Sequence, residues 1–148
     1  MNSRTGKILS INIGQEVGSK KRPVDRCRMV ANFGIEDDAH AGAEIRQVSL
    51  LAEESVEKIR HKGLTVTFGD FAENLTTEGI DLLSLPIGTK LRIGANVLIE
   101  ITQIGKVCHN RCRIFFEVGD CVMPREGIFA RVLSGGASAA GDPIAVEP

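Results

Sequence analysis

The fold is decided by the stretch Leu91-Arg-Ile-Gly-Ala-Asn-Val-Leu-Ile-Glu-Ile-Thr102. Its two apolar runs, Leu91–Ile93 and Val97–Thr102, have the alternation of strands that bury one face. The residues between them, Gly94-Ala-Asn96, are turn formers. The stretch predicts a β-hairpin, and short apolar runs beside glycines recur along the rest of the chain.

Further strands are predicted on both sides of this hairpin. Only the segment Leu51–Lys62 has the spacing of an amphipathic helix, with Ser49 as a candidate N-cap and Gly63 at its end. Many short strands and one clear helix predict a mainly β (α+β) fold built as a closed or partly closed β-barrel. The other predicted strands are Ile8–Ile13, Arg22–Val30, Gln47–Leu51, Ile128–Leu133 and Pro143–Val146.

The composition is that of one globular domain, which we expect to span residues 1–148. Hydrophobic residues make up 43% and charged residues 25%, and the net charge is -1. A general nucleic-acid binder is normally basic, so no nucleic-acid partner is expected. No apolar run is long enough to span a bilayer and the first residues do not form a secretory signal, so we expect no membrane association and a cytoplasmic location.

The segment Cys108-His109-Asn110-Arg111-Cys112, followed by Cys121, is the strongest candidate for chemistry. A cysteine becomes nucleophilic or metal-binding when nearby positive charge or a metal stabilises the thiolate. Arg111 and Arg113 flank Cys112 directly. The segment therefore predicts a reactive or ligating thiolate.

Two other interpretations of these cysteines stay open. A disulfide framework needs an oxidising compartment, for which the sequence gives no signal. A structural zinc site from Cys108, Cys112, Cys121 and a histidine is disfavoured because only one pair has the usual spacing of zinc ligands. Cys27 has no cysteine nearby and is expected to pack as a small hydrophobe.

Polar loop residues provide further candidates. His40 ends the acidic loop Gly34-Ile-Glu-Asp-Asp-Ala-His-Ala-Gly42, where it can bond a ligand or simply a loop carbonyl. Asn74 lies among turn formers, and such a residue is as often a turn element as a ligand contact. The basic run Lys20–Arg22, with Arg26 and Arg28, is expected to be a solvated face more often than an anion site.

Taken in order, several motifs resemble the MOSC family, whose domains are similar to the C-terminal part of molybdenum cofactor sulfurase. The resemblance covers nearly the whole chain, and the chain resembles a short stand-alone member. It is carried by the His40 loop, Arg46-Gln-Val-Ser-Leu-Leu51, Phe71-Ala-Glu-Asn-Leu-Thr-Thr-Glu-Gly-Ile-Asp81, Ile87–Gly94, the cysteine segment and Gly127-Ile-Phe-Ala-Arg-Val-Leu-Ser-Gly-Gly136.

The resemblance implies a β-strand-rich barrel with short peripheral helices, molybdenum cofactor (molybdopterin) as ligand, and a family-level association with pyridoxal phosphate. Cys112 is the best match to the family's key cysteine, as metal ligand or sulfur carrier, and Cys108 and Cys121 are contenders. Many members have Gly-Asp where this chain has Asp37-Asp38. The cofactor-binding residues that we expect from the resemblance are His40, Arg46, Asn74, Arg111 and Arg131.

The function predicted from these residues is a module that binds molybdenum cofactor or carries sulfur for it through a cysteine thiolate. A molybdenum-dependent reductase of N-hydroxylated compounds and a zinc-stabilised interaction domain are the alternatives. The expected partners are the cofactor itself or proteins that mature molybdoenzymes. The sequence leaves the oligomeric state open.

Overall fold

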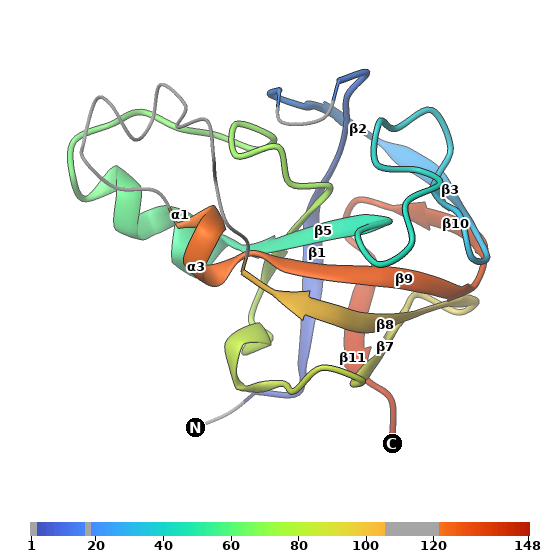
Figure 1. Ribbon diagram of the computed structural model, residues 1–148. Coiled ribbons are helices and arrows are strands. Elements are labelled where there is room, and N and C mark those ends of the chain that lie inside the picture. The colour runs from blue at the N-terminus through green and yellow to red at the C-terminus, as the bar shows by residue number, and fades with distance from the viewer. Residues whose placement is uncertain (1–2, 17–18, 106–121) are drawn as a thin grey trace.

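A computed structural model describes residues 3–16, 19–105 and 122–148 of the chain (Figure 1). The strands are β1 (Thr5–Ile13), β2 (Arg22–Val24), β3 (Arg26–Val30), β4 (Gly34–Ile35), β5 (Val48–Ala52), β6 (Leu75–Glu78), β7 (Lys90–Ile93), β8 (Val97–Ile104), β9 (Ile128–Ser134), β10 (Gly136–Ala139) and β11 (Pro143–Val146). The helices are α1 (Glu53–Arg60), the 3₁₀ helix η1 (Leu82–Ser84) and α3 (Met123–Glu126).

Seven strands close into a barrel. Their order is β11-β7-β8-β9-β5-β6-β1, and β1 pairs back with β11 to complete the ring. β2 extends this sheet from β1, while β10, β3 and β4 form a second, three-stranded sheet. β5 and β6 pair in parallel, so the chain needs a crossover between them, and this connection contains α1.

Aliphatic side chains fill the barrel. Ile8, Leu50, Leu91, Ile99 and Val132 are examples of residues with no more than 1% exposure that belong to one interior cluster. A second cluster lies under α1 and contains Leu51, Val56, Ile59, Val66, Phe71, Val122, Met123 and Phe129. β9 takes part in both, because successive side chains of a strand point to opposite faces.

The predicted fold class is confirmed, and so is the hairpin: Ile93 pairs with Val97 across a turn in which Gly94 has φ +60°. The helix is also confirmed, but it begins at Glu53 with Ala52 as N-cap, so Ser49 as N-cap was wrong. The single strand predicted over 22–30 is two strands in different sheets, because the chain bends at Asp25.

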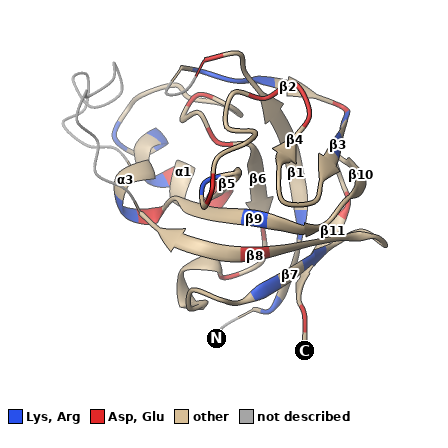
Figure 2. Cartoon of the chain, turned by 45° about the vertical axis from the view of Figure 1, so that its right-hand side comes forward, with Lys and Arg blue, Asp and Glu red and all other residues tan. Residues whose placement is uncertain are grey.

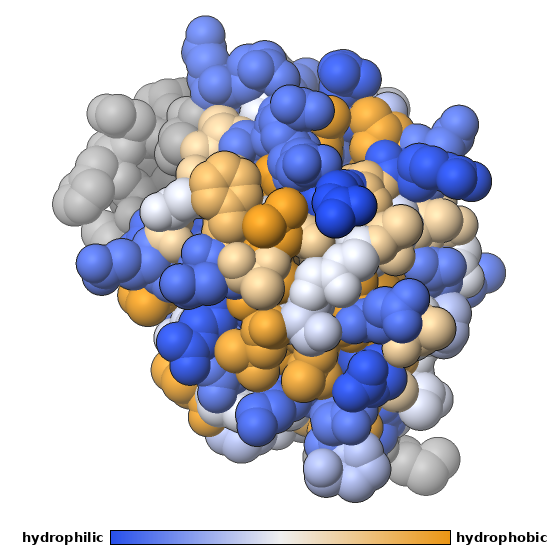
Figure 3. Space-filling model, turned by 90° about the vertical axis from the view of Figure 1, so that its right-hand side faces the viewer, coloured by the Kyte–Doolittle hydropathy of each residue, from blue (hydrophilic) through white to orange (hydrophobic). Residues whose placement is uncertain are grey.

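The surface of the molecule is mixed. On the face that carries β3 and β10, apolar side chains gather at the centre and hydrophilic ones surround them (Figure 3). Among the described residues, the large hydrophobic side chains that stay exposed are Phe33, Ile45, Leu83, Ile87 and Ile104. No helix in the described ranges is long and apolar enough to cross a membrane.

Candidate functional site

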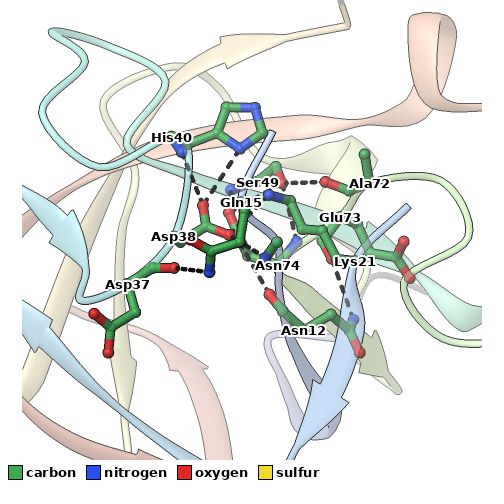
Figure 4. A network of polar contacts seen from close by, with 11 residues as sticks. Asn12, Gln15, Lys21, Asp37, Asp38, His40, Ser49, Ala72, Glu73 and Asn74 are labelled. Carbon is green, nitrogen blue, oxygen red and sulfur yellow. Dashed lines mark hydrogen bonds and ion pairs between the residues drawn. The ribbon is translucent and has the colours of Figure 1, made fainter. Parts of the chain in front are cut away.

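Three loops meet around a buried carboxylate, that of Asp38. The loops are the β1–β2 connection, the segment after β4 and the segment before β6. Figure 4 shows the polar residues that they bring together, with the His40 ring and amide both directed at Asp38. We call Lys21, Asp38, His40, Glu73 and their neighbours Asn12, Ser49 and Asn74 the polar cluster.

Asp38 is the hub of this cluster. One carboxylate oxygen accepts hydrogen bonds from the Gly14 amide at 3.0 Å and from the Lys21 ammonium at 2.8 Å. The other accepts the His40 amide at 3.0 Å and lies 3.4 Å from Nδ1 of His40. Burial opposes ionisation of Asp38, but the contacts from His40, Lys21 and Gly14 outweigh it and lower the pKa of the carboxyl group.

Lys21 is buried, although the sequence placed it in a basic run that we expected to be mostly solvated. The side chains of Lys21 and Asp38 both have an exposure of 0%. The neighbours Lys20 and Arg22 are exposed, as expected. A buried ion pair is costly to desolvate and is therefore weak evidence for stability. Its presence indicates that this part of the fold is specified by charge.

The loop before β6 supports Lys21 from the other side. The Lys21 amide donates to the Gly69 carbonyl at 2.9 Å, and the Gly69 amide donates to the Glu73 carboxylate at 3.1 Å. A Cβ on Gly69 would lie 2.1 Å from the Lys21 carbonyl oxygen, so only glycine fits there. Burial raises the pKa of Glu73, an effect that hydrogen bonds from Thr76, Gly69 and Phe71 oppose.

Backbone strain occurs next to both carboxylates. Asp37 has φ +68° and Ala72 has φ +64°, in the left-handed region that non-glycine residues seldom adopt. Aspartate tolerates this region better than most residues, which allows Asp37 to adopt a conformation that glycine adopts freely.

Asn74, predicted as a cofactor contact, joins β5 to β1 in this structure. Its side-chain oxygen accepts the Ser49 amide at 2.9 Å, and its side-chain nitrogen donates to the Asn12 carbonyl at 3.1 Å. Asn74 is fully buried. These contacts give Asn74 a structural role, and its contact with a cofactor stays a prediction.

Arg46 is exposed and is linked through Gln103 to Gly105. Its guanidinium carbon is 5.4 Å from the centre of the Phe129 ring, a cation–π distance. The Arg46 Nε donates to the Gln103 side chain at 3.1 Å, and Gln103 in turn donates to the Gly105 carbonyl at 2.8 Å. Gly105 is the last residue that the structure describes before the gap at 106–121, and one side chain, that of Gln103, lies between it and Arg46.

Arg131, the other described arginine among the predicted residues, projects from β9. It is paired with Glu100 on β8 at 2.7 Å, and Figure 2 shows the basic and acidic positions side by side on these strands. Arg131 is partly exposed, and a ligand that approached its Nε or Nη2 would compete with Glu100.

The predicted residues Cys108, Cys112, Cys121 and Arg111 lie outside the described residues. Cys27 is described as a free cysteine, and burial together with the charges of Asp142 and Asp38 raises the pKa of its thiol to about 12. Cys27 is therefore a poor nucleophile. Within residues 3–16, 19–105 and 122–148, no group of three or more His, Cys, Asp or Glu side chains is arranged to hold a metal.

A cavity of about 310 Å³ opens between α1, η1 and the N-terminal end of β1. It shares no residue with the polar cluster and none with the predicted site. Its lining residues are Ser3, Ala52, Glu54, Ser55, Lys58, Gly79, Ile80, Asp81, Leu82, Leu83 and Glu126.

Comparison with known proteins decides the family. The family model described as "MOSC domain" matches residues 37–145, which include His40, Arg46, Asn74 and the cysteine segment. The chain belongs to the MOSC domain family. This family is associated with molybdenum-cofactor-related proteins. No match was found among curated proteins.

Solved structures share the MOSC fold of this chain. YuaD from Bacillus subtilis superimposes with a TM-score of 0.79 at 20% identity, over 96% of this chain and 95% of that one. YiiM from Geobacillus stearothermophilus gives 0.71 at 23% identity, over 97% and 75%, and YiiM from Escherichia coli gives 0.67 at 18%, over 100% and 70%. These similarities show the fold alone.

Lys21, Asp38 and Glu73 are site residues that the sequence did not single out individually. Asp38 was considered only as part of the acidic loop and of the Asp37-Asp38 pair, and Lys21 only as part of a charge run. A usable signal did exist in Asp38, because it stands two residues before the candidate His40. The 17-residue separation between Lys21 and Asp38 gave no such indication.

Proposed function

We propose that this MOSC domain binds molybdenum cofactor or carries sulfur for it, through the thiolate of Cys112. The observation that carries the proposal is the family match over residues 37–145, which includes the cysteine segment and the described candidate residues. A thiolate is the soft ligand that suits molybdenum, and a persulfide carrier needs the same ionised thiol.

The described residues fit the anionic part of such a ligand at Arg46. Within the part of the chain that the structure describes, Arg46 donates its side-chain hydrogen bond from Nε, which leaves the two terminal nitrogens for a phosphate in the forked geometry of guanidinium groups. Gln103 links this arginine to Gly105, which precedes Cys108 by three positions in the sequence. Arg46 would therefore hold the phosphate while Cys112 holds the metal or the sulfur.

Each remaining candidate has a more limited role in this proposal. Arg131 would contribute after exchanging Glu100 for the ligand, and Arg111 would add positive charge beside Cys112. Asn74 would act by holding β5 and β1 in place. When bound, the cofactor supplies a metal that exchanges electrons and binds sulfur; the chain supplies the thiolate, the cationic anchor and the rigid barrel that carries them.

The test is the molybdenum, pterin and persulfide content of the full chain purified from a molybdenum-replete host. We expect Cys112→Ser to lose the bound cofactor or persulfide while keeping its fold, since the substitution is nearly isosteric. Cys27→Ser is the matched control and should keep the ligand, because the Cys27 thiol is held in its neutral form.

Other outcomes would redirect the proposal. Retention of the ligand by Cys112→Ser, with loss in Cys108→Ser or Cys121→Ser, would assign the role to that cysteine. Zinc in place of molybdenum, with unfolding on chelation, would favour the zinc-stabilised domain. Neither molybdenum nor persulfide in any preparation from that host would contradict the proposal.

A further inference from the structure

The ring of His40 carries a buried nitrogen that lacks a hydrogen bond. Nδ1 has no hydrogen-bond partner within the described residues, and its nearest acceptor is the Asp38 carboxylate at 3.4 Å. That distance is long for a hydrogen bond between nitrogen and oxygen. Leaving a buried polar atom without a partner is destabilising, so its retention needs an explanation.

Asp38 is arranged as if to hold this ring. Its carboxylate is fully buried and kept ionised by Lys21, and it is fixed by the amides of Gly14 and His40 itself. The preceding residue, Asp37, is in the left-handed conformation. Strained residues of this kind persist where the surrounding structure holds them, and they cluster at functional sites.

The arrangement fixes which ring nitrogen is free. A carboxylate facing Nδ1 favours the tautomer with the proton on Nδ1, which leaves the lone pair on Nε2. Of the two His40 ring nitrogens, Nδ1 is buried without a partner among the described residues and Nε2 is not. The His40 side chain keeps 11% of its surface exposed. Nε2 is therefore the nitrogen that reaches the surface, on the side of the ring away from Asp38 (Figure 4).

We propose that His40 is a general base whose Nε2 accepts a proton from a weakly acidic O–H or S–H group of a bound small molecule. The proton moves from that oxygen or sulfur to Nε2, the ligand keeps the bonding electron pair, and no electron is exchanged. Asp38 is the positioning residue, because its carboxylate faces Nδ1 and so holds the ring with Nε2 directed away from it. Lys21 in turn holds the Asp38 carboxylate in place at 2.8 Å.

This inference does not depend on the identity of the cofactor or on which cysteine is reactive. It concerns the His40 ring of the polar cluster instead of a cysteine, and the reaction is a proton transfer. A cofactor-free preparation of the full chain is therefore sufficient to test it.

The first measurement is the tautomer of His40 in the wild-type chain, read from the ¹⁵N shifts of its ring nitrogens at a pH where the ring is neutral. We expect a protonated Nδ1 and a bare Nε2. The second is the rate at which diethyl pyrocarbonate acylates His40, read by peptide mass against the exposed His61 as internal reference. We expect Asp38→Asn to slow this relative rate by roughly tenfold, by analogy with the loss of affinity or activity when the carboxylate partner of a metal-bound histidine is removed.

The matched control is Asp37→Asn, which removes the same charge one residue away and keeps a side chain that tolerates the left-handed backbone. It should leave both the tautomer and the relative rate unchanged. A proton on Nε2 in the wild type would overturn the proposal without any variant. An unchanged rate in folded Asp38→Asn, or an equal loss in Asp37→Asn, would also overturn it.

Discussion

The interior of the barrel and the ion pair of the polar cluster are equally buried but are made of different chemistry. The barrel holds aliphatic side chains such as Leu50, Leu91 and Ile99, each with 0% exposure. The cluster holds an ion pair whose two side chains are just as inaccessible. In the first region shape and volume decide which residue fits, whereas in the second the charge and the number of hydrogen-bond donors decide.

This difference indicates where stability and function are located. Apolar burial contributes about 25 cal/mol for each Å² removed from water, so the barrel needs no charge to fold. A buried ion pair contributes little net stability compared with apolar residues of the same volume. In this fold the buried Lys21–Asp38 pair lies beside the strained residue Asp37 and beside Nδ1 of His40, which has no partner among the described residues. The stability of the core does not require this arrangement.

The largest effect that separates the two regions is expected from Lys21→Met. Removing the ammonium leaves the Asp38 carboxylate buried without its counter-charge, which costs about 3–5 kcal/mol of unfolding free energy. The matched control is Ile99→Met, which introduces the same side chain into the barrel and should cost less than about 1.5 kcal/mol. Urea unfolding of both variants measures the difference.

A double variant shows whether charge is the cause. Lys21→Met combined with Asp38→Asn removes both charges and retains an oxygen for the Gly14 amide, so it should be more stable than Lys21→Met alone. If the double variant is no more stable, then lost packing of the lysine chain explains the effect. Packing would in that case determine stability in the polar cluster as it does in the barrel.

A second, smaller effect concerns pH, because the two buried carboxyl groups are shifted in opposite directions. The pKa of Asp38 is lowered, so its stabilising contribution is present above the ordinary value near 3.9 and is lost as the pH falls through the folded-state pKa. The pKa of Glu73 is raised by burial, so its contribution is present below the ordinary value and is lost as the pH rises through the folded-state pKa.

We therefore expect the stability difference between the wild type and Asp38→Asn to be constant from about pH 5 upward and to narrow below about pH 4. The opposite pH dependence is expected for Glu73→Gln: as the pH rises, the wild type should lose stability relative to this variant. Unfolding curves recorded between acidic and neutral pH provide both comparisons. A difference for Asp38→Asn that is independent of pH would show that Asp38 is not held as the carboxylate.

The sequence predicted the barrel better than the cluster for a physical reason. Strands such as β8 can be predicted from alternating apolar residues, because this alternation reflects burial of one face of the strand. β6 was missed because Leu75-Thr-Thr-Glu78 has no such alternation, and Thr76 and Thr77 are nevertheless fully buried. The burial of these threonines depends on β1 and β5, the strands that pair with β6 and that lie far from it in the sequence.

Lys21 and Ser49 show the same limit at single positions. Lys21 is buried because it pairs with Asp38, and the sequence does not show that the loop containing Asp38 lies next to it. Lys21 was therefore assigned to a solvated run. Ser49 stood where a helix N-cap was expected, but its amide is bound to Asn74, 25 residues further on. His40 and Arg46 were selected by resemblance, yet their partners Asp38 and Gln103 became visible only in three dimensions.

The smallest effect is expected at the strained residue in the loop before β6. Ala72 has φ +64°, a conformation that costs an L-residue about 1–2 kcal/mol and that glycine adopts freely. Ala72→Gly should relieve this strain, and the greater freedom of glycine in the unfolded chain offsets part of the gain, so we expect a net stabilisation of up to about 1 kcal/mol. Ala130→Gly in the extended strand β9 is the control, and it should destabilise the fold because no strain is relieved there. Thermal unfolding of the two variants should show melting-temperature shifts of opposite sign if Ala72 is strained and Ala130 is not. A loss of stability in Ala72→Gly would mean that the Ala72 methyl group packs well enough to outweigh the strain.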